Sequence, residues 1–229
     1  MLPTPSLVIG AGYCKQPFEG RSLVNVSGMS FGAISEPAVK ALSLGAKEAG
    51  CWMDTGEGGL APHHLVGGCD VIMQMGTAKY GMRDVDGNFS PERVKELAQQ
   101  VKAFEIKLSQ GAKPGKGGVL PGGKVTEEIA RIRGIPVGQD SISPNRHPDI
   151  ANVDQLLDMV VRIRELSGRP VGVKTAVGGW EFANELCEAV LRRGKEYAPD
   201  FLTIDGAEGG SGAAPQTLMD HMEIGRAHV

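Results

Sequence analysis

Two lysines lie near the ends of apolar stretches, where a positive charge needs a partner. Lys107 lies in the stretch FEIKL and Lys174 in the stretch VGVKTA. An ammonium group is costly to bury unless it meets an anion or a dipole, although a long side chain can also carry its charge out to water. Because two lysines share this placement, we favour a role in stabilising a bound anionic group, such as a substrate carboxylate.

A long loop rich in glycine and lysine follows the first of these lysines. Residues 107–125 read KLSQGAKPGKGGVLPGGKV. Glycine lets a backbone approach a ligand closely, and lysine supplies a mobile positive charge. A loop of this kind after a strand predicts a site for an anionic ligand. Gln110 in this loop and Gln74 earlier in the chain are candidate amide contacts to a heterocycle.

A second glycine-rich loop, residues 206–215, reads GAEGGSGAAP. It follows an apolar strand pattern, a position at which barrels often bind phosphate through backbone N–H groups. The loop lacks the lysine of a P-loop. A flexible turn is the alternative, but the density of glycines favours ligand contact. Glu57 also lies among glycines, in TGEGG, where it could accept a hydrogen bond from a ligand or cap a helix.

Cysteines and histidines give little support for a metal site. The four cysteines form no C-x-x-C pair, so reduced thiols of a cytosolic protein are the simpler interpretation. His63, His64 and His147 adjoin prolines and resemble loop histidines, with metal binding the less favoured alternative. We therefore expect no metal ligands. The cysteines are Cys14, Cys51, Cys69 and Cys187.

The composition is that of a globular protein without special affinity for nucleic acid or membranes. The chain has 229 residues, 41% of them hydrophobic, and a net charge of −3. No apolar run is long enough to span a bilayer, and no signal peptide is recognisable. A cytoplasmic location is the expectation. The 33 glycines cluster after apolar runs, which is typical of functional loops rather than of a low-complexity tract.

Apolar strand patterns alternate with helical ones along the chain, which predicts a parallel sheet covered by helices. Ligand-type residues follow nearly every strand. An open sheet concentrates its site at one switch point, whereas a barrel gathers the loops of all its strands at one mouth. We therefore predict an α/β fold, an incomplete (β/α)8 TIM barrel with about seven of its eight strands. The predicted strands are 23–29, 51–55, 70–75, 104–108, 136–139, 171–176 and 201–205, and the predicted helices are 36–49, 91–100, 126–133, 153–166 and 180–193.

The barrel pattern covers residues 21–222. Residues 1–20 have no clear element and are interpreted as the remnant of a longer segment. Residues 223–229 match the translation of a widely used sequencing adapter, so we expect a non-native tail and a native sequence that is truncated near Met222. An eighth strand is expected beyond that point.

Four segments together resemble the FMN-binding domain of the glutamate synthase family. They are residues 27–35 (SGMSFGAIS), 55–59 (TGEGG), 107–125 and 205–215, the last of which resembles the loop after the seventh strand. Their order and spacing agree with the family over roughly residues 20–220. The resemblance is closest to the stand-alone branch, which has the flavin barrel without an attached glutaminase domain.

The resemblance implies FMN over the barrel mouth and reductive amination of a 2-oxo acid. In that family a hydride from reduced flavin converts the imine of 2-oxoglutarate and ammonia into glutamate, and an iron–sulfur cluster passes electrons to the flavin. The implied catalytic residues are Lys107, Gln110 and Lys174. The implied cofactor-binding residues are Met29, Ser30, Glu57, Gln74, Lys174, Gly209, Gly210 and Gly212.

The sequence also departs from the family. It lacks the cysteine-rich cluster motif and an N-terminal catalytic cysteine, so an iron–sulfur cluster is expected only elsewhere in a full-length protein. The segment 80–83 (YGMR) differs from the large synthases and leaves the substrate open. We expect a 2-oxo acid, ammonia and an electron-donor protein or NAD(P)H-linked subunit as partners, and no activity from this fragment alone.

Two other functions remain open. The first is a different FMN barrel enzyme, such as an α-hydroxy-acid oxidase or an isopentenyl-diphosphate isomerase. An oxidase needs a histidine base near a late strand, and residues 171–212 contain no histidine. The second is a non-catalytic flavin subunit that transfers electrons.

Overall fold

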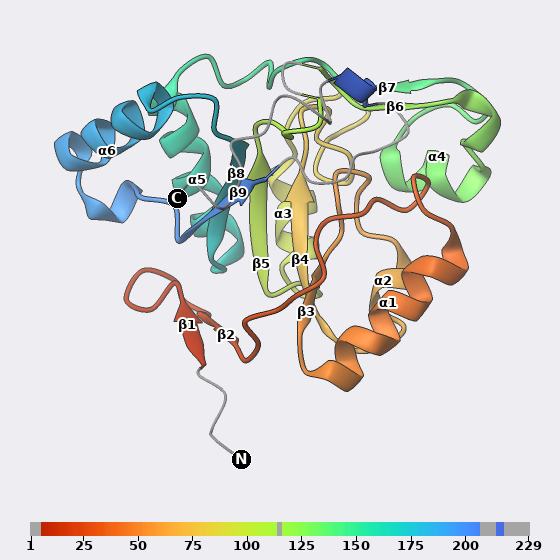
Figure 1. Cartoon of the computed structure of the whole chain (residues 1–229), viewed down its shortest axis with the longest axis horizontal. Coiled ribbons are helices and arrows are strands. Elements are labelled where there is room, and N and C mark those ends of the chain that lie inside the picture. Colours follow the sequence, from red (N-terminus) through yellow and green to blue (C-terminus); the bar gives the residue numbers. More distant parts are fainter. Residues whose placement is uncertain (1–5, 114–115, 207–213, 218–229) are drawn as a thin grey trace.

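A computed structural model of the chain describes residues 6–113, 116–206 and 214–217 (Figure 1). The strands are β1 (Leu7–Ile9), β2 (Phe18–Gly20), β3 (Trp52–Asp54), β4 (Asp70–Met75), β5 (Ala103–Lys107), β6 (Val119–Leu120), β7 (Ser141–Ile142), β8 (Val171–Ala176) and β9 (Phe201–Asp205). The helices are α1 (Glu36–Ala49), α2 (Pro62–Leu65), α3 (Pro91–Leu97), α4 (Glu127–Arg133), α5 (Val153–Ser167) and α6 (Glu181–Arg193), with short 3-10 helices η1 (Gly122–Lys124) and η2 (Lys195–Tyr197).

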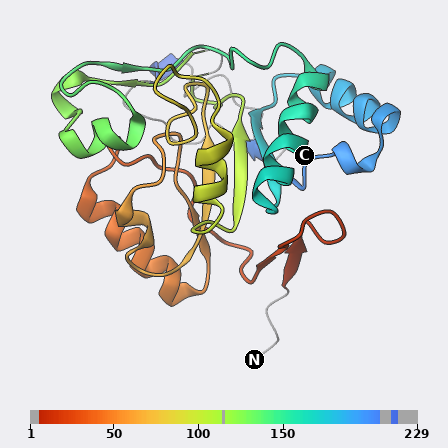
Figure 2. The same cartoon turned by 180° about the vertical axis from the view of Figure 1, so that it is seen from behind.

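Five parallel strands form the main sheet, in the order β3-β4-β5-β8-β9. This order follows the chain, and the sheet curls as half of a barrel would (Figures 1 and 2). Val26 adds a further parallel segment through a single bridge to Met53 of β3. The predicted α/β fold with a parallel sheet is confirmed, whereas the described residues do not contain eight barrel strands.

The stretch 23–29 is not a strand, contrary to the prediction from its apolar residues. The Ser22 hydroxyl donates to the Val24 carbonyl at 2.6 Å and accepts from the Val24 N–H at 3.2 Å, which bends the chain. Leu23 and Val24 are 78% and 80% exposed, so they add nothing to the core. Only Val26 pairs with the sheet, because the turn ends just before it.

The stretch 136–139 is not a strand either. Pro136 has no N–H to donate to a ladder, and Gly138 adopts a φ of 73° within a turn. β5 consequently pairs directly with β8, and the neighbouring β7 forms a separate antiparallel pair with β6. Among the described residues β9 is therefore the sixth parallel segment counted from Val26, whereas the sequence pattern placed it seventh.

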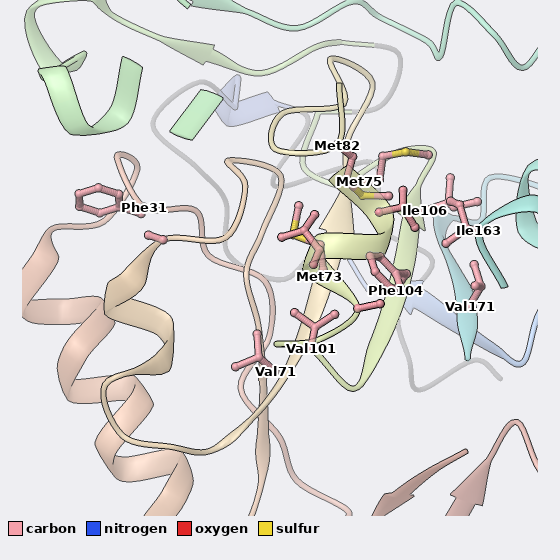
Figure 3. Close-up of a cluster of buried hydrophobic side chains, with 14 of the residues drawn as sticks. Phe31, Val71, Met73, Met75, Met82, Val101, Phe104, Ile106, Ile163 and Val171 are labelled. Carbon is pink, nitrogen blue, oxygen red and sulfur yellow. The ribbon is translucent and has the colours of Figure 1, made fainter. Parts of the chain in front are cut away.

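Alternate residues of the main sheet pack into two different cores. On the helix side, Met73 and Phe104 belong to the large core (Figure 3). On the inner side, Ile72 and Ala103 pack against Phe18 of the β1–β2 hairpin, so the prediction that residues 1–20 contain no clear element was wrong. This hairpin lies at the amino ends of the strands (Figure 1). The inner side is thus filled by apolar side chains near the strand starts, which leaves the carboxyl ends for polar groups.

Helices α1, α4, α5 and α6 agree with the predicted ranges to within one residue at each end. Apolar residues at helical spacing bury one face of each, and glycines at positions 50, 134 and 168 end three of them in the left-handed conformation. Among the described helices, none has both the length and the apolar character needed to cross a membrane.

Replacing the cap of α5 is expected to destabilise the fold moderately. The Asn152 side chain accepts a hydrogen bond from the Gln155 N–H at 3.0 Å, and Asn152→Ala should lower the free energy of unfolding by about 1 kcal/mol. Asn184→Ala, at an exposed position inside α6, removes no cap and should cost nothing. Denaturant titration compares the two variants, and an equal loss in both would contradict the capping role.

Candidate functional site

Charged and polar side chains line the inner side of the sheet near the carboxyl ends of its strands. Residues two apart on a strand share a face, so Glu105 and Lys107 of β5 lie on the same side as the inward-facing Ala103. Strand pairing places Gln74 of β4 beside Glu105, and Lys174 of β8 beside Lys107. Residues far apart in the chain therefore meet on one surface.

Glu57 holds two lysines together at this surface. Its carboxylate lies 3.2 Å from the Lys107 Nζ and 3.7 Å from the Lys113 Nζ. Burial alone would raise the pKa of Glu57, but the two ammonium groups lower it below its ordinary value. Burial lowers the pKa of Lys107, and the charge of Glu57 opposes that effect. The result is a mostly buried triad in which two cations share one anion.

Two further predicted residues adjoin this triad. The Lys107 Nζ donates to the Gln110 Oε1 at 3.0 Å. On the neighbouring strand the Lys174 Nζ lies 3.4 Å from a carboxylate oxygen of Asp205. The structure thus brings Lys107 into contact with both Gln110 and Glu57 and places Lys174 on the adjacent strand.

Two buried carboxyl groups, Asp54 and Glu105, lie on the same inner side and were not singled out from the sequence. Glu105 accepts hydrogen bonds from the Gln74 amide at 2.7 Å and the Thr203 hydroxyl at 2.5 Å. Burial and the nearby charge of Glu105 raise the pKa of Asp54 well above its ordinary value. Because the Gln74 amide donates to Glu105, its N–H group points toward β5. The sequence did contain a signal for Glu105, since it stands two residues before Lys107 in an apolar strand pattern and therefore on the same face.

Glycines surround this cluster where a side chain would collide with it. A Cβ at Gly28 would lie 2.5 Å from the Asp54 Oδ1, and one at Gly76 would lie 2.6 Å from the Glu57 Cβ. A Cβ at Gly118 would collide with the Glu57 carboxylate. Loops from three parts of the chain can therefore approach the carboxylates closely only because these positions lack side chains.

Met29 and Ser30 lie against the turn that begins at Gly56. Gly56 has a φ of 66°, and a Cβ there would lie 2.5 Å from the Ser30 N and 2.8 Å from the Met29 C. The backbone N–H of Gly56 in turn donates to Asp54 at 2.6 Å. The first and second loops therefore pack together beside the polar cluster.

A buried arginine on the wall of the cluster was also missed from the sequence. Arg133 donates to the Ser141 hydroxyl at 3.0 Å and to the Phe31 carbonyl at 3.3 Å. Ser141 donates to the Tyr80 hydroxyl at 2.8 Å. Arg133 also contributes to the lowered pKa of Glu57. In the sequence it is one of several basic residues at a helix end, so nothing marked it as buried.

His147 supports the end of β5. Its Nε2 lies 2.8 Å from the Lys107 carbonyl oxygen, and burial lowers the pKa of its imidazole below the ordinary value. The sequence interpretation as a loop histidine gave no hint of this contact. His147 thereby fixes the backbone from which the Lys107 side chain extends.

The remaining predicted site residues, Gly209, Gly210 and Gly212, lie outside the described residues. Two cavities lie away from the polar cluster. One, of about 280 Å³, is lined by the β1–β2 hairpin and the start of β9, and the other, of about 220 Å³, by α2, α3 and α4 residues. Neither gathers the paired charges found at the strand ends, which therefore remain the candidate site.

Removing the central carboxylate is expected to give a pH-dependent loss of stability. Glu57→Gln should lower the free energy of unfolding by about 2 kcal/mol near neutral pH, because hydrogen bonds to charged groups contribute ~1.5–3 kcal/mol. The folded-state pKa of Glu57 is lowered, so its contribution is present above the ordinary glutamate pKa and is lost as the pH falls through the folded value.

Denaturant titrations at several pH values, with the exposed Glu185→Gln as control, measure this difference. The gap between wild type and Glu57→Gln should close in acid, while the control stays close to wild type. A gap that is constant from neutral to acidic pH would show that the charge of Glu57 is not its cause.

Residues 4–225 match the family described as "Conserved region in glutamate synthase". The chain is 45% identical over 221 residues to the glutamate synthase large subunit-like protein YerD of Bacillus subtilis, covering 95% of the chain and 42% of that protein. It is 36% identical over 203 residues to the archaeal-type glutamate synthase (NADPH) of Thermotoga maritima, covering 88% of the chain and 37% of that protein. It is 38% identical over 204 residues to the archaeal glutamate synthase (NADPH) of Methanocaldococcus jannaschii, covering 88% of the chain and 36% of that protein. The chain therefore spans about two fifths of the length of these relatives.

Proposed function

The chain belongs to the glutamate synthase family, and from this premise we propose that it forms the flavin-binding part of an oxidoreductase that makes glutamate from 2-oxoglutarate and ammonia. The observation that carries the proposal is the contact of Lys107 with both Glu57 and Gln110 at the carboxyl ends of parallel strands. This is the end of the sheet at which barrel enzymes hold their substrates.

FMN fits the donor set of this surface. The ammonium groups of Lys107 and Lys174 and the amide of Gln74 suit the oxygen and nitrogen acceptors of a flavin ring. The absence of side chains at Gly28 and Gly118 lets their loops lie directly against Asp54 and Glu57, which keeps these loops close to the polar surface. Bound FMN would supply the hydride for the reduction. The residues proposed to hold it are Met29, Ser30, Glu57, Gln74, Lys174, Gly209, Gly210 and Gly212.

A 2-oxo dicarboxylate fits the charge of the triad formed by Glu57, Lys107 and Lys113. Because Lys107 and Lys113 share the single carboxylate of Glu57, the triad retains a positive charge that a substrate carboxylate can offset. Lys107 can also stabilise negative charge that develops on the oxo oxygen of the substrate or on the nitrogen of the imine formed from it. Gln110 holds the Lys107 ammonium in place from the loop side.

Electrons must reach the site from another group. Two relatives carry NADPH in their names, which supports an NADPH-linked donor or donor protein for the complete enzyme. An iron–sulfur cluster would be held by residues outside this chain. The free cysteines at positions 14, 51, 69 and 187 support a reducing compartment and hence the cytoplasm.

The test is turnover by the complete protein. Purified full-length protein supplied with a reductant, ammonium and 2-oxoglutarate should form glutamate, and leaving out either ammonium or 2-oxoglutarate should abolish it. Bound flavin without turnover of any 2-oxo acid would favour a flavin subunit that only transfers electrons. Turnover of a 2-hydroxy acid with oxygen would favour the oxidase class.

A further inference from the structure

A second cluster of chemically active side chains lies outside the strand-end site, where α1, α2 and α4 meet. Glu36 begins α1, His63 lies in α2 and Glu128 lies in the first turn of α4. One ligand-type atom from each residue lies within 4.8 Å of the other two. Three separate helices therefore bring one imidazole nitrogen and two carboxylates near one another.

The imidazole of His63 is held rigidly in this cluster. Its side chain is largely buried, and the Phe31 ring packs edge-on against it with 4.9 Å between ring centroids. The Nε2 lies 3.1 Å from the Glu128 carboxylate. A buried imidazole with one nitrogen fixed toward carboxylates is pre-organised to bind a cation, since few side-chain rotations remain to be frozen.

We propose that Glu36, His63 and Glu128 bind a divalent transition-metal ion of the zinc type. One imidazole nitrogen with two carboxylate oxygens is a donor set that suits zinc, with a water molecule completing the tetrahedron. Carboxylates and waters alone would favour magnesium or calcium, whereas the imidazole favours zinc. The proposal is independent of the flavin chemistry proposed above.

Each carboxylate has another partner that the metal must displace or share. Glu36 pairs with Lys40 one turn along α1, and Glu128 pairs with His63 itself. Both carboxylates also lie in the first turns of helices, where they stabilise the positive helix ends. These interactions compete with the ion, so the affinity should rise when the Lys40 ammonium is removed.

The ion would connect the helices to the wall of the candidate site. Phe31, whose ring contacts His63, follows Met29 and Ser30, and its carbonyl accepts a hydrogen bond from Arg133. A bound ion would tie α1, α2 and α4 together around this segment and raise the thermal midpoint of unfolding.

Calorimetric titration of the whole chain with zinc chloride tests the site. The wild type should bind one ion at the cluster, and His63→Ala and Glu128→Gln should each weaken that binding by about 100-fold. Loss of a residue that only supports a metal ligand already costs up to about 100-fold in affinity, so loss of a ligand should cost at least as much. Lys40→Met should strengthen it. Glu127→Gln, at the exposed position next to Glu128, and Cys187→Ser, which removes an exposed thiol, should leave it unchanged.

A cobalt titration gives a readout that does not depend on stability. Wild type should develop the visible bands of tetrahedral cobalt, and His63→Ala should not. Absence of zinc binding by folded wild type would overturn the proposal. So would zinc binding that is unchanged in both His63→Ala and Glu128→Gln, or that is lost in Cys187→Ser.

Discussion

Lys107→Met is expected to reduce kcat/KM of the complete enzyme for 2-oxoglutarate by about 10²–10³-fold, the usual cost of removing one donor that stabilises developing charge. Lys107 contacts both Glu57 and Gln110, so the substitution removes the cation at the centre of the cluster. Methionine keeps most of the side-chain volume, so the strand should pack as before.

Steady-state kinetics and the flavin content of each preparation measure this effect. Lys102→Met serves as a control, since Lys102 lies just before β5 with its side chain 46% exposed, 3.9 Å from Asp70. The control should retain wild-type kinetics. A Lys107→Met enzyme that contains flavin and turns over at the wild-type rate would contradict the assignment of Lys107 to the reaction.

Gly56→Ala is expected to cost about 3 kcal/mol or more of stability, the sum of a strained backbone and an overpacked contact. Gly56 has a φ of 66°, and the new Cβ would lie 2.5 Å from the Ser30 backbone nitrogen. Because that neighbour is backbone, it cannot rotate away as a side chain could. The two loops that meet at this point would have to separate, and FMN binding should weaken with them.

Gly50→Ala separates the effect of backbone strain from the effect of the close contact with Ser30. Gly50 has a similar φ of 68°, but nothing lies within 4 Å of a Cβ there. It should cost only the backbone strain, about 1 kcal/mol. Thermal unfolding and FMN titration of both variants compare them. Equal destabilisation in the two would show that the contact with Ser30 is unimportant.

Much of the sheet could be predicted from the sequence, because β4, β5 and β8 are mostly buried on both faces and therefore read as runs rich in apolar residues. The ranges 70–75, 171–176 and 201–205 coincide with β4, β8 and β9. The stretch 136–139 was predicted wrongly because an apolar pattern does not reveal that a proline and a left-handed glycine make a turn.

The candidate site was only partly readable from the sequence. Strand-end lysines and glycine-rich loops are unusual in a core, so Lys107 and Lys174 stood out. Asp54 and Glu105 did not, because their proximity depends on strand pairing between segments remote in sequence. The partnership of Gln74 with Glu105 has the same origin. Which buried charges share a site is decided by sheet register, which the local pattern does not contain.

The visible absorption spectrum of the purified complete protein tests the proposed cofactor most directly. Bound flavin should give its two bands in the near-ultraviolet and blue regions, and the compound released on denaturation should be FMN. Lys107→Met and Lys102→Met preparations recorded beside it show whether binding depends on the cluster. A correctly folded protein that is colourless and takes up no FMN on titration would contradict the proposed function.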